Sequence, residues 1–154
     1  MIRRLFTLFT ALAGMVFLAT PVSAGGAVTS TTNIHGPFPP FHADALCGLP
    51  SGMVSGTGNS VFHVTINAAG DFWLTSTQEA SITFTPDDPT MPTFAGHVAA
   101  WFGVSDNNRN SVLHDALNGN LTATDGSGAS ITLHAVDHIS VSANGQVNLF
   151  MTCH

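Results

Sequence analysis

The chain has 154 residues, nine Asp and Glu against only three Lys and Arg, and a formal net charge of −6. Two of the three arginines, Arg3 and Arg4, lie at the extreme N-terminus, and there is no lysine. Nucleic-acid binding and docking on an anionic membrane both need several basic side chains. The composition therefore excludes both, while the length suits one domain with its own core.

The first 24 residues have the pattern of an export signal. Arg3 and Arg4 begin it, an apolar stretch follows from Leu5 to Thr20, and Val22-Ser23-Ala24 supplies small residues at the cleavage positions. We expect cleavage after Ala24 and a secreted, extracellular protein, because no second apolar stretch approaches the roughly 20 residues of a membrane span. Export by the general or by the twin-arginine route stays open.

Residues 25–50 are expected to form an extended lead-in outside the sheet, and residues 51–154 an all-β domain. The lead-in has no apolar alternation and contains four prolines, Pro37, Pro39, Pro40 and Pro50, which favour extended or polyproline conformation. Ser51–Ser60 is rich in glycine and is expected to be flexible.

From Val61 onward, apolar and polar residues alternate as in half-buried strands. In chain order we expect strands at Val61–Asn67, Asp71–Glu79, Thr93–Val104, Ile131–Ser142 and Gln146–Cys153, with Ser81–Thr85 extending the second or forming another. Pro86–Pro92 is expected to be a loop, and Asp125-Gly126-Ser127-Gly128 and Asn144-Gly145 are tight-turn sequences.

Val112–Thr124 is ambiguous. Leu113, Leu117 and Leu121 recur every four residues, as in a helix, but Asn118-Gly119-Asn120 would break one and favours a strand with a bulge or reversal. The pattern as a whole predicts an all-β fold, an antiparallel barrel or sandwich of about 6–8 strands, and leaves those two architectures open.

Cys47 and Cys153 are the only cysteines and bracket nearly all of the expected sheet. In an oxidising exterior, two cysteines are most simply one disulfide. This bond would join the lead-in to the last strand. A redox-active pair would usually be close in sequence, so we expect a structural bond.

Sorting the expected strands by parity separates two faces. Phe62, Val64, Ile66, Phe72, Leu74, Phe94, Val98 and Phe102 form an apolar face. The other face gathers His63, Asp71, Trp73, His97, Trp101, Thr132, His134 and His138. This second face is either an ordinary solvent face or, if the sheet closes, the lining of a ligand cavity.

The carboxylates and histidines suggest weaker candidates. Asp137 and Asp115 fall on the apolar parity of their segments, where a carboxylate must be hydrogen-bonded, sit at a bulge or be catalytic. His134 and His138 are four residues apart, which on a strand separates them by roughly 13 Å, too far to share one ion. No zinc motif is present, so we expect no metal and no cofactor.

Several segments together resemble small secreted β-rich proteins of actinomycetes: Gly58-Asn59-Ser60-Val61-Phe62-His63, Gly70-Asp71-Phe72-Trp73, Gly96-His97, Trp101-Phe102-Gly103, His134, and Asp137-His138-Ile139-Ser140-Val141-Ser142. The resemblance covers Cys47–Cys153. It implies a secreted single domain of actinobacterial type and brings no catalytic residues with it.

The leading functional hypothesis is an extracellular binding or interaction module, expected to be a monomer. Its site would use Trp73, Trp101, His63 and His97 for a carbohydrate or another small neutral ligand. The main alternative is a β-barrel enzyme of cyclase or hydrolase type, with His63, His97, His134 or His138 and Asp137 as acid and base. A third is a structural or inhibitory surface protein without a pocket.

Overall fold

The computed structural model describes residues 26–107 and 109–154, so the export signal expected at residues 1–24 lies outside the described part. Seven strands follow one another: β1 (Val28–Ala43), β2 (Gly52–Ile66), β3 (Phe72–Pro86), β4 (Phe94–Asp106), β5 (Asn110–Ala123), β6 (Ser130–Ser142) and β7 (Val147–Cys153).

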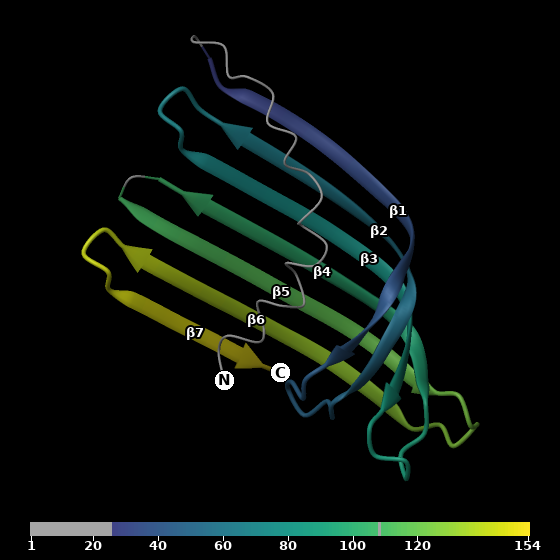
Figure 1. The fold of residues 1–154 in the computed structure, drawn as a ribbon. Helices are drawn as coiled ribbons and strands as arrows, with labels where there is room; N and C mark the ends of the chain where they lie inside the picture. The colour runs from purple at the N-terminus through teal and green to yellow at the C-terminus, as the bar shows by residue number, and fades with distance from the viewer. Residues whose placement is uncertain (1–25, 108) are drawn as a thin grey trace.

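Each strand pairs antiparallel with the next, in the order β1-β2-β3-β4-β5-β6-β7, to form one sheet (Figure 1). Within the described residues β1 and β7 do not pair with each other, so the sheet is open. The all-β prediction is confirmed. Over the same residues, no helix is long and apolar enough to span a membrane.

The lead-in differs from the expectation, because Val28–Ala43 is strand β1 and pairs with β2 over nearly its whole length. Its prolines fit because β1 lies at an edge, where a missing N–H can face outward, and because a register shift between Phe38 and Phe41 accommodates Pro39 and Pro40. The expectation of a flexible Ser51–Ser60 is also wrong, since this segment belongs to β2.

Glycines allow the long strands to bend sharply, as Figure 1 shows for β1 and β2. A Cβ on Gly56 would collide with the backbone oxygen of Ser81 on β3, and one on Gly96 with that of Asn120 on β5. Neighbouring strands approach each other at these points more closely than a side chain allows. Gly56, in the segment expected to be flexible, and Gly96 therefore allow the sheet to curve.

The best-packed part of the apolar face lies where β1 ends and β2 begins. Phe84 is fully buried there, in a cluster whose other buried members are Ala43, Val54, Phe94, Leu121 and Ala123. Of the apolar stripe expected from parity, Phe62 and Phe94 are buried and the rest are half-buried. The core is thus concentrated at one end of the sheet.

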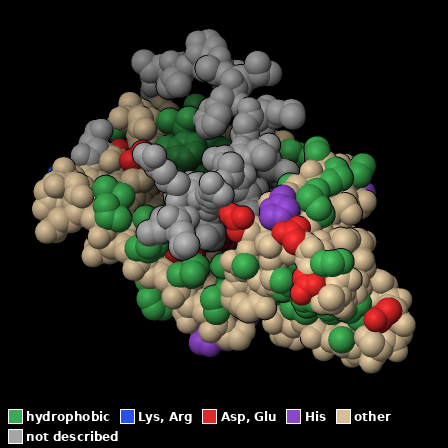
Figure 2. Space-filling view, turned by 60° about the horizontal axis from the view of Figure 1, so that its bottom comes forward, with side chains coloured by type: hydrophobic (Ala, Val, Ile, Leu, Met, Phe, Trp, Pro, Cys, Tyr) green, Lys and Arg blue, Asp and Glu red, His purple; other side chains and the backbone are tan. Residues whose placement is uncertain are grey.

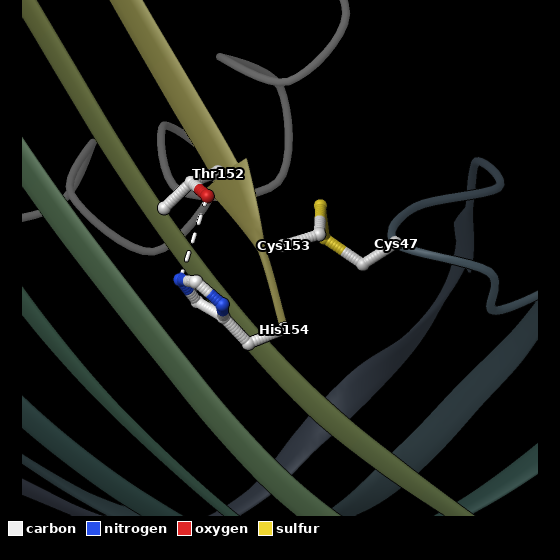
Figure 3. Close-up of a disulfide and its surroundings, with 4 residues drawn as sticks. All are labelled: Cys47, Thr152, Cys153 and His154. Atoms are coloured by element: carbon white, nitrogen blue, oxygen red, sulfur yellow. Dashed lines mark hydrogen bonds between the residues drawn. A yellow bond between two sulfur atoms is a disulfide. The ribbon is translucent and has the colours of Figure 1, made fainter.

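The expected bond between Cys47 and Cys153 is present, across a sequence separation of 106 (Figure 3). Cys47 lies in a two-residue turn closed by hydrogen bonds between the backbones of Leu46 and Leu49, at 3.0 and 2.8 Å. Cys47 and Gly48 both have positive φ, 52° and 81°. The bond joins the β1–β2 connection to the end of β7 and so links the two sides of the open sheet.

Candidate functional site

The residues singled out from the sequence divide between the two faces of the sheet. Directly paired residues share a face, and the pairs His63–Thr75, Thr75–Gly103, Gly103–His114 and His114–His138 form one row across five strands. Trp73, Trp101, His97 and His134 lie at even spacings from this row and share its face. Asp137 lies on the opposite, apolar face.

Trp101 packs onto Gly103. The nearest atoms to a Cβ built on Gly103 are three carbons of the six-membered indole ring, the closest at 2.6 Å. Only a glycine leaves room for the ring in this position. The indole is thereby held against the sheet, while Trp101 remains 42% exposed.

Trp73 lies on the neighbouring strand β3, close to Gly103. It pairs with Ser105, two residues beyond Gly103, so Trp73 and Gly103 are diagonal neighbours at about 7–8 Å. Trp73 is 41% exposed. Trp73, Trp101 and Gly103 are called the tryptophan patch below; the two tryptophans lie on either side of the Thr75–Gly103 row on one face.

None of the direct cross-strand neighbours of the tryptophan patch is Asp, Glu, Lys or Arg, although Glu79 lies diagonal to Trp101 and Asp71 two residues before Trp73. These direct neighbours are Thr65, Thr75, Thr77, Ser105, His114 and Ala116. In contrast, acidic side chains are spread over the face seen in Figure 2, where hardly any Lys or Arg is visible. The residues directly opposite the patch thus offer hydroxyl, imidazole and methyl groups, and the nearest charged side chains are acidic.

Of the expected ligand-binding histidines, the structure brings only His63 close to the tryptophans. His63 is a diagonal neighbour of Trp73, and its Nδ1 lies 2.8 Å from the hydroxyl of Thr31. His97 lies four residues from Trp101 and six from Gly103 along β4, roughly 13 and 20 Å away, and its Nε2 is 3.2 Å from the hydroxyl of Ser81.

A histidine pair borders the patch on the β5 side, formed by the expected candidate His138 and by His114, which sequence reasoning did not place in the site. His114 pairs directly with Gly103 on one side and with His138 on the other, and the two imidazole centroids are 4.2 Å apart. Their Nδ1 atoms are 3.0 Å apart, a distance at which one ring can donate a hydrogen bond to the other. In the sequence, His114 lies 12 residues before Gly126 and His138 lies 12 residues after it, so a hairpin centred on Gly126 would have predicted their pairing.

His134 belongs to a different part of the face. Its imidazole centroid lies 5.5 Å from that of His154, whose Nε2 is 3.4 Å from the hydroxyl of Thr152 (Figure 3). Asp71 lies in the β2–β3 turn, where Asn67 donates a hydrogen bond to its carboxylate at 2.8 Å. His134 is thus occupied by contacts away from the tryptophans, and Asp71, although two residues from Trp73, by its contact with Asn67.

On the apolar face, Asp137 pairs directly with Asp115. The Oδ1 atoms of both are buried without a hydrogen-bond partner among the described residues. The pKa of Asp115 is raised to about 6, mainly by burial and secondly by the charge of Asp137. A hydrogen bond from the Ala116 backbone opposes this rise. Because burial and a neighbouring carboxylate both oppose its ionisation, Asp115 keeps its proton to higher pH than an isolated carboxyl does.

The histidine–Asp137 set required by the enzyme hypothesis is not assembled. His138 is adjacent to Asp137 in sequence, but neighbouring residues on a strand point to opposite faces. Within residues 26–107 and 109–154, no group of three His, Cys, Asp or Glu side chains is arranged to hold a metal ion.

Comparisons of the chain with protein-family models, with curated proteins and with solved structures found no significant match. The fold and the tryptophan patch are therefore interpreted from their own chemistry.

Proposed function

We propose that this protein is an extracellular binding module that holds a neutral, ring-containing ligand, most simply a carbohydrate, on the tryptophan patch. The packing of the Trp101 ring on Gly103 carries the proposal, because it immobilises a half-exposed indole before any ligand arrives. A preorganised aromatic side chain loses little conformational entropy on binding.

The chemistry around the rings supports a neutral ligand. Indole rings offer apolar surface to the C–H faces of a sugar, and the neighbouring hydroxyls of Thr65, Thr75 and Ser105 can exchange hydrogen bonds with its hydroxyl groups. A phosphate or carboxylate would find no Lys or Arg among the patch's direct cross-strand neighbours.

The test is titration of the purified protein with neutral oligosaccharides of several linkages, followed by tryptophan fluorescence and calorimetry. Both tryptophans of the chain lie in the patch, so binding should change the emission directly. Loss of one stacked ring costs about 1–2 kcal/mol, so Trp73→Ala and Trp101→Ala should each weaken binding by about tenfold or more.

His97→Ala is the matched control, since His97 shares the face but lies roughly 20 Å from Gly103. It should bind as the unmodified protein does. The proposal fails if no member of the panel changes the fluorescence, or if both tryptophan variants keep full affinity for a ligand that does bind.

The second candidate function is acid–base catalysis by Asp115 and Asp137. A carboxyl whose pKa is raised to about 6 beside a second carboxyl is suited to act as general acid at mildly acidic pH. Hydrolysis of chromogenic glycosides and esters near pH 5, abolished in both Asp115→Asn and Asp137→Asn, would support catalysis. Equal rates in the protein and both variants would exclude it.

A further inference from the structure

Among the described residues, β1 and β7 are the outer strands of the sheet, and these two edges are built differently. Along β1, Pro37, Pro39 and Pro40 lack N–H groups, and the register shift between Phe38 and Phe41 interrupts the strand. Such features prevent another strand from pairing with an edge. β7 has no proline, no charged residue and an unbroken register with β6.

β7 is also unusually apolar for an exposed edge. Four of its seven residues are exposed large hydrophobics: Val147 at 62%, Leu149 at 46%, Phe150 at 57% and Met151 at 49%. They point to both faces, since Phe150 alternates with Leu149 and Met151. An exposed, uncharged apolar edge is a site for pairing with a further strand.

The hydrogen bonds between β6 and β7 show which backbone N–H and C=O groups of β7 can pair with a further strand. Ser142 donates its N–H to the Gln146 carbonyl at 2.9 Å, and His154 donates its N–H to the His134 carbonyl at 3.0 Å. Hydrogen-bonded positions alternate along an antiparallel pair, so even-numbered residues of β7 bond to β6. The N–H and C=O groups of Leu149 and Met151 therefore point outward.

We propose that β7 pairs antiparallel with β7 of a second copy of this chain, about a two-fold axis at Phe150. In this register Leu149 opposes Met151 of the second copy, so the outward backbone groups of both strands meet. The hydrogen bonds of the sheet then continue from one copy into the other.

The side chains of β7 are self-complementary in the same register. Leu149 meets Met151 on the apolar face, while Asn148 meets Thr152 on the polar face and Phe150 meets its own equivalent. Apolar residues thus oppose apolar ones and polar residues oppose polar ones. β7 brings no charge that would repel its copy, which is why a second copy is favoured over a charged partner.

This proposal replaces the monomer expected from the sequence, and sedimentation of the protein with its disulfide intact tests it. We expect a dimer that dissociates on dilution. Leu149→Pro removes an outward N–H without removing a bond to β6, so it should weaken the dimer by about a hundredfold, the effect of two lost hydrogen bonds. A monomer at all concentrations up to about 1 mM would overturn the proposal.

A pair of cysteine variants tests the register even if Leu149→Pro fails to fold. Facing Phe150 residues would have Cα atoms about 4.5 Å apart, within disulfide range, so Phe150→Cys should cross-link two chains on mild oxidation. Asn148→Cys is the matched control, since its equivalent lies about four residues away, roughly 13 Å. Equal cross-linking of the two variants would contradict the proposed register.

Discussion

The two faces of the sheet carry the same strands but differ in what their side chains do. The apolar face contains the fully buried Phe84 and, farther along, two carboxyls opposite each other at Asp115 and Asp137. The polar face carries the half-exposed Trp73 and Trp101, whose direct cross-strand partners are uncharged. Stability should therefore depend on the first face and binding on the second, and the following experiments test that division.

The largest effect is expected for Phe84→Ala. Phe84 is 0% exposed and lies within the buried cluster. Removing a buried phenyl ring costs about 3–5 kcal/mol through lost burial and the cavity left behind. Urea unfolding followed by circular dichroism measures this, and a loss below about 1 kcal/mol would mean that the cluster does not form the core.

Removing the disulfide comes next. Replacing both Cys47 and Cys153 by Ser should lower the free energy of unfolding by about 2–4 kcal/mol, because the bond closes a loop with a sequence separation of 106. Thermal unfolding of this variant should match that of the unmodified protein after reduction. If neither the variant nor the reduced protein unfolds at a lower temperature, packing alone holds the two sides of the sheet together.

The paired carboxyls should make the apolar face sensitive to pH. The folded-state pKa of Asp115 is raised from 3.8 to about 6, so its protonation stabilises the fold fully below about pH 4, and this contribution is lost as pH rises through 6. After allowance for partial exposure, the free energy of unfolding should fall by about 1–2 kcal/mol from pH 4 to pH 7 through this group.

Asp115→Asn should remove that fall, which urea titrations at several pH values would detect. Asp125→Asn is the control, because hydrogen bonds from the side chain and backbone of Ser127 lower the pKa of the exposed Asp125. It should leave the fall in place. The same pH profile for both variants would mean that Asp115 is not the group responsible for the fall.

The smallest effect on stability is expected on the polar face. Trp73→Ala should change the free energy of unfolding by about 1 kcal/mol or less, because much of the side chain is already in water. The same variant should lose ligand affinity. A loss of stability comparable to that of Phe84→Ala would contradict the proposal that stability depends on the apolar face and binding on the polar face.

Particular residues show which features of the structure could be predicted from the sequence and which could not. Alternation alone predicted the shared face of His63, Trp73 and Trp101, and the parity of Asp115 and Asp137, because side chains alternate with a period of two whatever the sheet does. The same reasoning missed β1, since its prolines and Thr-rich start resemble a linker. Prolines are tolerated there only because β1 is at an edge, which depends on the whole topology.

The sequence by itself determined the fold class, the disulfide partners and the two faces, because each depends on local periodicity or on there being only two cysteines. Only the tertiary structure decided which residues meet. It paired His114 with His138 and Asp115 with Asp137, packed Trp101 on Gly103, and left His97 apart. These contacts depend on strand register, and a shift of one residue would send every side chain to the other face.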